Sequence, residues 1–328
     1  MVSSHAFYLL GPPRIERDDE PVKLDRRKAI ALLAFLAVTG ESHRRDSLVN
    51  LLWPDYDSSR GRAAFRRTLY AIRNALGGDW LVANWDHIGL DPSATPWTDG
   101  SQFRQHLAAC ETHEHPISEV CSACATSLTD AVALVRGDFL GGFSLKDSAN
   151  FDDWQLFQAE ALRRELAGAL ERLIRWHSAQ REFELAVGYA QRKLALDPLD
   201  EQAHRHLMRL YAWSGRRTAA LRQYEECTAL LDEQLGVPPQ PETTKLYQNI
   251  HEGQVPSLPE GWKRETIMPS RPADGLPAEP PSLGTQAVAR QPSSKNSPGA
   301  LRPITPAWSS PRALQRPYRR RRSLSTLP

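Results

Sequence analysis

Residues 60–76 read RGRAAFRRTLYAIRNAL, and the spacing of their apolar residues decides the fold of the first part of the chain. At about 100° per residue, a helix would place Phe65, Leu69, Ile72 and Leu76 in one narrow apolar stripe. An adjoining arc without acidic residues collects the polar side chains of this segment: Arg62, Arg66, Arg67, Tyr70, Arg73 and Asn74. The pattern predicts a helix that is anchored by one face and basic on the other.

The neighbouring segments make this helix the third of a small domain. Residues 28–38 are apolar nearly all round, and a shorter helical segment at 45–52 ends before Pro54. After the basic helix, residues 80–90 read as a β-hairpin, and a strand at 6–10 and a small hairpin at 14–24 come first. Three helices followed by a hairpin wing are the layout of a winged helix-turn-helix.

The rest of the chain divides into a helical segment and a tail. Residues 101–251 are predicted to be almost entirely helical, and a repeat of 34 residues aligns Ala186 with Ala220 and Leu173 with Leu207. That period is typical of tetratricopeptide (TPR) helix pairs. The tail is rich in proline and arginine and is expected to be disordered. We therefore expect a mainly α protein with a small α+β N-terminal domain (1–96), an all-α TPR-like domain (97–252) and a disordered tail (253–328).

Composition restricts the classes of function. Residues 97–252 hold 16 Lys and Arg against 23 Asp and Glu, so any DNA contact must come from a local basic patch elsewhere. No apolar run approaches the roughly 18 residues of a membrane span, and the first residues do not resemble a secretory signal. Four cysteines in 328 residues do not make a disulfide scaffold, so we expect a cytoplasmic protein. No phosphate-binding loop, dinucleotide motif or Ser/His/Asp arrangement stands out, so an enzyme is not expected.

The basic helix is interpreted as a DNA-recognition helix. Its apolar stripe would hold it rigid while the exposed arc enters the major groove of double-stranded DNA. Arginine can contact phosphates or the O6/N7 edge of guanine, and Asn74 could pair with adenine. In the wing, His87 could reach the DNA as well. The alternative is a solvated helix face, but the hairpin that follows the helix favours DNA recognition.

Two further groups of residues are candidate sites. The loop between the second and third helices, with Trp53, Asp55, Tyr56 and Asp57, is a plausible docking point for another protein, although Asp57 or Ser58 could simply cap the third helix. A second group supplies four soft ligands for a structural zinc ion, with His115 competing for the place of the first histidine: Cys110, His113, Cys121 and Cys124. The alternatives are reduced thiols or a redox pair. No other cofactor is expected.

Several motifs resemble a known family. Arg26-Arg27-Lys28-Ala29, Leu51-Leu52-Trp53-Pro54 and the end of the basic helix at 72–77 resemble the OmpR-like winged helix of Streptomyces antibiotic regulatory proteins. Residues 136–140 and 211–243 resemble the bacterial transcriptional activation domain paired with it. The resemblance implies an activator that binds direct repeats near promoters as a homodimer and contacts RNA polymerase through the loop at 53–57. The alternative is a TPR-like protein-interaction adaptor with a non-functional DNA-binding domain.

Overall fold

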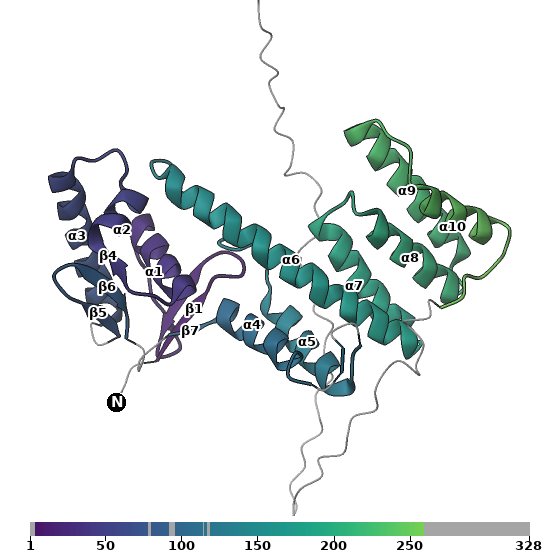
Figure 1. Cartoon of the computed structure of the whole chain (residues 1–328), viewed down its shortest axis with the longest axis horizontal. Coiled ribbons are helices and arrows are strands. Elements are labelled where there is room, and N and C mark those ends of the chain that lie inside the picture. Colours follow the sequence, from purple (N-terminus) through teal and green to yellow (C-terminus); the bar gives the residue numbers. More distant parts are fainter. Residues whose placement is uncertain (1–3, 78–79, 92–95, 114, 117–118, 259–328) are drawn as a thin grey trace, which may run out of the picture. The chain divides into compact units, whose positions relative to one another are not determined.

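The computed structural model describes residues 4–77, 80–91, 96–113, 115–116 and 119–258. These residues belong to one compact unit with a small mixed part at its N-terminus and a larger helical part after it (Figure 1). Both parts contribute to a single hydrophobic core, so the boundary at residue 96 stays a prediction. Most of the tail, from residue 259 on, lies outside the described residues. No described helix is long and apolar enough to cross a membrane.

The first sheet has the strand order β3-β2-β1-β7. Strand β1 (His5–Tyr8) pairs antiparallel with β2 (Arg14–Arg17), which pairs antiparallel with β3 (Glu20–Pro21). Asp18 and Asp19 form the turn of the expected β2–β3 hairpin with φ of 52° and 64°, a backbone conformation that Asp tolerates better than most residues. Strand β7 (Trp97–Thr98), which the sequence did not predict, pairs parallel with β1. It anchors the segment that enters the helical part on the N-terminal sheet.

The expected winged helix-turn-helix follows this sheet. It consists of α1 (Arg27–Thr39), α2 (Arg45–Leu52), α3 (Ser58–Leu76) and the wing strands β5 (Leu81–Ala83) and β6 (His87–Leu90). A short strand before α2, β4 (His43–Arg44), pairs with β6 and completes a sheet of order β4-β6-β5. The four residues of the predicted apolar stripe of α3 are all buried.

Three contacts hold α3 against the rest of the winged helix. The Asp57 carboxylate caps its start by accepting hydrogen bonds from the amides of Ser59 and Arg60 at 3.0 and 2.9 Å. Near that end Gly61 lies so close to α2 that a Cβ atom would meet Val49 Cγ1 at 2.6 Å. At the other end His5 Nε2 lies 2.8 Å from the carbonyl oxygen of Leu76. The position of α3 is therefore determined at both ends.

The helical part confirms the TPR-like repeat. Its helices are α4 (Asp99–Ala109), α5 (Ser122–Leu134), α6 (Ala149–Ala179), α7 (Phe183–Leu196), α8 (Glu201–Trp213), α9 (Arg217–Leu235) and α10 (Pro241–His251). Arg181 and Gly215, one repeat apart, both have left-handed φ angles of 62° and 77° in the turns after α6 and α8. The next residue in each turn donates its amide to a carbonyl five positions back, at 2.8 Å in both repeats.

A buried carboxylate joins the two parts of the unit. Asp99 is 1% exposed, and its two oxygens accept hydrogen bonds from the amides of Leu9 and Leu10 at 2.7 and 2.9 Å. Burial raises the pKa of Asp99, although these amides and Arg136 oppose that shift. Beyond Asp99, the Ser148 hydroxyl donates to the Leu52 carbonyl at 2.6 Å. The winged helix is thereby tied to the helical part at two separate places.

A charged cluster stabilises the junction of α6, α7 and α8. The Glu171 carboxylate accepts hydrogen bonds from Lys193 Nζ at 3.0 Å and from His206 Nε2 at 2.9 Å. Burial alone would raise the pKa of Glu171, but His206 and Lys193 outweigh it and hold this pKa well below its usual value. Because the folded state favours the carboxylate, its stabilising effect is complete above the unfolded pKa near 4.5 and is lost as the pH falls below it.

We expect Glu171→Gln to lower the free energy of unfolding by about 2 kcal/mol at neutral pH, because it removes one of the two carboxylates that pair with the buried Lys193 and leaves only Asp200. The deficit should shrink as the pH falls below about 4.5. Urea unfolding followed by circular dichroism measures both effects. The matched control is Glu165→Gln on the same helix, whose pair with Arg104 is much more exposed than the pair of Glu171 and Lys193, so a change below about 1 kcal/mol is expected. Equal effects of the two substitutions would contradict the prediction.

Candidate DNA-binding surface and metal cluster

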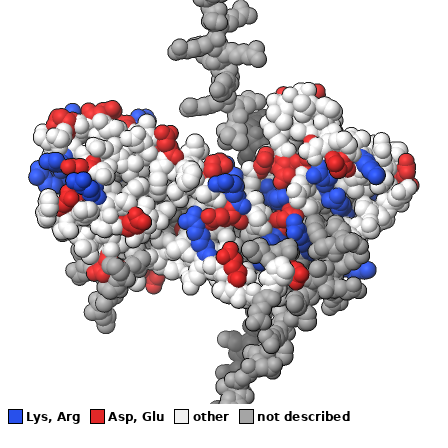
Figure 2. Space-filling view, in the orientation of Figure 1, with Lys and Arg blue, Asp and Glu red and all other residues white. Residues whose placement is uncertain are grey.

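The exposed face of α3 carries every side chain of the predicted recognition arc. All six residues are exposed: Arg62, Arg66, Arg67, Tyr70, Arg73 and Asn74. Tyr70 shows 68% of its surface, which is unusual for a large aromatic side chain on a helix with a buried stripe. Figure 2 shows a group of basic side chains in the region of α3 at the left of the view, with acidic side chains beside them.

One arginine of this face has an intramolecular partner that the sequence pattern did not reveal. Arg62 donates two hydrogen bonds to the Asp46 carboxylate of α2, from Nε at 2.9 Å and from Nη2 at 3.0 Å. The bond from Arg62 is the main reason why the pKa of Asp46 lies below its usual value. The arc contains no acid of its own, but the neighbouring helix supplies one.

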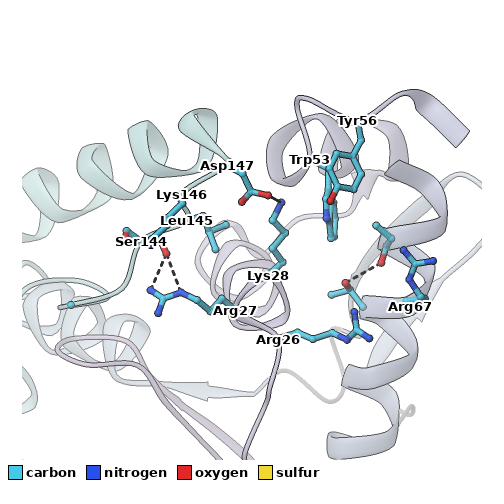
Figure 3. Close-up of a pocket in the computed structure, with 13 residues that line it drawn as sticks. Arg26, Arg27, Lys28, Trp53, Tyr56, Arg67, Ser144, Leu145, Lys146 and Asp147 are labelled. Atoms are coloured by element: carbon cyan, nitrogen blue, oxygen red, sulfur yellow. Dashed lines mark hydrogen bonds and ion pairs between the residues drawn. The ribbon is translucent and has the colours of Figure 1, made fainter. Parts of the chain in front are cut away.

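The other arginines of the arc are differently placed. Among the described residues, Arg66, Arg67 and Arg73 have no side-chain hydrogen bond or ion pair. Arg67 also lines a pocket of about 790 Å³ between the winged helix and the segment before α6. Figure 3 shows Arg26 extending from the residues before α1 towards α3, where Arg67 projects from the helix. The basic surface of α3 therefore continues to the start of α1.

The two cations next to Arg26 have structural partners in the same pocket. Arg27 donates to the Ser144 carbonyl from Nε and Nη2 at 3.1 and 2.9 Å. Lys28 Nζ lies 2.8 Å from the Asp147 carboxylate (Figure 3). Of this basic triplet, Arg26 alone is exposed without such a partner among the described residues. Arg27 and Lys28 bind the winged helix to the segment before α6.

The wing exposes His87, which was predicted as a DNA contact, and Trp85, which was not. His87 is 42% exposed, with Nδ1 3.4 Å from the Asp86 carboxylate. Asn84 closes the turn, because its side-chain oxygen accepts the amides of Asp86 and His87 at 2.9 and 2.6 Å. Trp80 is buried, whereas Trp85, between the two wing strands, is 89% exposed. The sequence pattern did not single out this exposed indole.

The loop between α2 and α3 separates into anchored and exposed residues. Trp53 is 5% exposed and packs edge-to-face on Phe65, with 6.2 Å between ring centroids. Asp57 caps α3, and the Arg60 guanidinium lies 4.1 Å from the centre of the half-buried Tyr56 ring. Asp55 is exposed. The predicted docking loop therefore offers Asp55 and one side of Tyr56, held in place by Trp53 and Asp57.

The structure brings three of the four predicted metal ligands together and replaces the fourth, Cys110, by His115. Donor atoms of His113, His115, Cys121 and Cys124 all lie within 4.8 Å of one another. The first ligand expected from the sequence, Cys110, is not among them, because its Sγ turns to the carbonyls of His106 and Cys124 at 3.6 and 3.7 Å. Cys110 lies in the C-terminal turn of α4, which directs its side chain into the α4–α5 contact. The competing residue His115 takes its place.

The two thiols of this cluster differ in acidity. Burial alone would raise the pKa of Cys121, but hydrogen bonds from the Cys124 amide and from the imidazoles outweigh it and lower the pKa to about 6. Burial raises the pKa of Cys124 to about 12. The surroundings therefore favour the thiolate form at Cys121 over that at Cys124.

Most of the described chain is similar to known bacterial regulatory proteins. Residues 98–251 match the family model of the bacterial transcriptional activator domain. The chain is 29% identical to regulatory protein AfsR of Streptomyces griseus over 74% of its own length and 24% of that protein. It is 26% identical to transcriptional regulatory protein EmbR of Mycobacterium bovis, over 74% of this chain and 62% of that protein. The chain thus spans less than two thirds of the curated relatives it matches.

A solved structure shows the same fold. The structure of Mycobacterium tuberculosis EmbR in complex with a low-affinity phosphopeptide aligns with a TM-score of 0.60 and 22% identity, over 80% of this chain and 69% of that one. A winged helix with a basic third helix precedes the matched domain in this chain. Residues 98–251 thus match the bacterial transcriptional activator domain, and over 74% of its length the chain is similar to the regulatory proteins AfsR and EmbR.

Proposed function

We propose that this protein is a transcription activator that binds double-stranded DNA at promoter repeats through α3 and the wing. The observation that carries the proposal is the group Arg66, Arg67 and Arg73, which lies on the exposed face of a helix fixed by a buried stripe and has no intramolecular charge partner among the described residues. Guanidinium groups without such a partner are available for phosphates and guanine edges. The names of the relatives as regulatory proteins support the same function.

The geometry suggests which residues read bases and which hold the backbone. Entry of α3 into the major groove would bring Arg66, Tyr70, Arg73 and Asn74 to base edges, while Arg67 and Arg26 face the adjoining phosphates. His87 and Trp85 would meet the DNA beside the groove, the indole by apolar contact with sugars or bases. Arg62 contributes after exchanging Asp46 for a phosphate.

The α2–α3 loop is the proposed contact with RNA polymerase. Asp55 and the exposed side of Tyr56 lie at the N-terminal end of α3, outside the arc proposed to face DNA. Trp53 supports this loop from the core and does not present a contact surface. Binding to repeats, as in the family that the motifs resemble, would place two copies side by side as a homodimer on DNA.

Replacement of Arg66 and Arg67 by alanine should weaken specific DNA binding at least about 30-fold, because each arginine contact contributes roughly 1–3 kcal/mol. Fluorescence anisotropy of the full chain measures this, with a duplex that wild-type protein selects from genomic fragments and a scrambled duplex of equal length. Wild-type protein should prefer the selected duplex by roughly 10³-fold or more.

The matched control is Arg222→Ala, which removes an exposed arginine from α9 and should change affinity by less than about twofold, since it lies outside the proposed interface. Circular dichroism checks that the double variant is folded, as expected for two exposed side chains. Undiminished binding by the double variant would refute the recognition helix. Failure of wild-type protein to prefer any genomic fragment would instead favour the adaptor function.

The double substitution Asp55→Ala/Tyr56→Ala should abolish most activation and leave DNA affinity within about twofold, because these side chains lie off the recognition arc. In vitro transcription from the selected promoter and anisotropy on the same duplex separate the two effects. Asp57→Ala is the contrasting variant, since loss of the α3 cap should weaken DNA binding itself. Full activation by the double variant would show that polymerase is contacted elsewhere.

A further inference from the structure

The loop between α4 and α5 carries a second site, unrelated to the DNA surface. His113 Nδ1 lies 3.2 Å from Cys121 Sγ and 3.1 Å from Cys124 Sγ, and His115 Nε2 lies 3.4 Å from Cys124 Sγ. We propose that His113, His115, Cys121 and Cys124 bind one zinc ion in a closed tetrahedral site, which fixes this loop to the start of α5.

The spacing of the donor atoms suits such a site. Bonds of about 2.3 Å to sulfur and 2.0–2.1 Å to nitrogen give a tetrahedron with edges of roughly 3.3–3.8 Å. The contacts between donors, at 3.1–3.4 Å, lie just below or at the short end of that range. All the donors lie within 4.8 Å of one another, so small shifts of side chains would complete the tetrahedron.

The orientation of His115 is the one a metal ligand needs. Its Nδ1 lies 3.1 Å from the Pro116 carbonyl, so this nitrogen carries the proton and donates it. The Nε2 lone pair then points at the thiols. An outer hydrogen bond of this kind determines the tautomer and the ring angle of metal-bound histidines. Cys121 has a comparable support, because its Sγ accepts a hydrogen bond from the Cys124 amide at 3.4 Å.

The chemistry of the donors selects zinc. Two thiolates and two imidazoles match the borderline-soft character of this ion, whereas calcium and magnesium require oxygen ligands. Two thiolates would also balance the charge of a divalent cation. This matters because Cys124 is completely buried and Cys121 is 8% exposed. All four positions are filled by protein, as in structural and not catalytic zinc sites.

The position of the site indicates what the ion does. Cys121 is the N-cap residue of α5, and both histidines precede it in the loop that leaves α4. The described residues of this loop, 111–113, 115–116 and 119–121, form no helix or strand, so four metal bonds would hold a segment that backbone pairing does not. The ion would thus stabilise the α4–α5 hairpin, of which α5 packs on α6.

The experiment is metal analysis of the full chain, purified under reducing conditions with Zn²⁺ supplied. We expect about one zinc per chain, and Co²⁺ added to chelated protein should give the intense visible bands of a tetrahedral site with thiolate ligands. Zn²⁺ should displace Co²⁺ and raise the melting temperature of the metal-free protein, because an ion that binds only the folded state stabilises it.

Single substitutions identify the ligands. Cys124→Ser and His115→Ala should each reduce retained zinc to below about one tenth per chain after dialysis against a chelator, because the closed site then lacks a ligand. Cys110→Ala is the matched control, since it removes a buried thiol of the same hairpin whose Sγ lies outside the cluster. Cys227→Ser on α9 is a distant control, and both controls should retain one zinc.

Three results would overturn the proposal. The first is wild-type protein that is folded by circular dichroism and takes up neither Zn²⁺ nor Co²⁺. The second is loss of zinc in Cys110→Ala with retention in His115→Ala, which would restore the ligand set expected from the sequence. The third is a Cys121–Cys124 disulfide, found by mass spectrometry in protein alkylated at lysis. If a ligand variant fails to fold, Co²⁺ spectra of wild-type protein still decide between a tetrahedral site with thiolates and no such site.

Discussion

The Asp99 carboxylate holds the two parts of the protein together. It is the first residue of α4 and reaches back to the amides of Leu9 and Leu10, just beyond β1. Two buried amides that lack another acceptor make this carboxylate hard to replace. With β7 paired to β1, the helical part starts directly on the N-terminal sheet. The winged helix and the helical part therefore share one continuous hydrophobic core.

The basic side chains of the winged helix fall into two groups, one that contacts the helical part and one that faces solvent. Arg27 and Lys28 face the segment before α6 and hold the two parts in contact. Arg26, Arg66, Arg67 and Arg73 face solvent. A motif of three basic residues in a row does not tell which of them is structural. That distinction depends on Ser144 and Asp147, which are more than a hundred residues away.

The sequence predicted what depends on local periodicity. The stripe of Phe65 and Leu69 determined the buried face of α3, and the 34-residue spacing that aligns Ala186 with Ala220 predicted the repeated helix pairs, in which both alanines are buried. It could not predict what depends on tertiary contact. β7 has only two residues and no periodicity, and the Asp46–Arg62 pair joins different helices. The choice of His115 over Cys110 depends on where α4 ends, and the exposure of Trp85 on the length of the wing.

The pairing of Arg62 with Asp46 bears on how the protein would search a genome. Each arginine that meets a phosphate from free solution releases condensed counterions, and the logarithm of affinity then falls by about 0.9 per phosphate for each tenfold rise in salt. Arg62 already has a carboxylate as its counterion, so its transfer to DNA releases less. Binding to a random duplex, where Arg62 would meet phosphates alone, would then gain little affinity from this residue. If α3 binds DNA as proposed, the Asp46 carboxylate would shorten the residence time on non-target DNA without removing an arginine from the target complex.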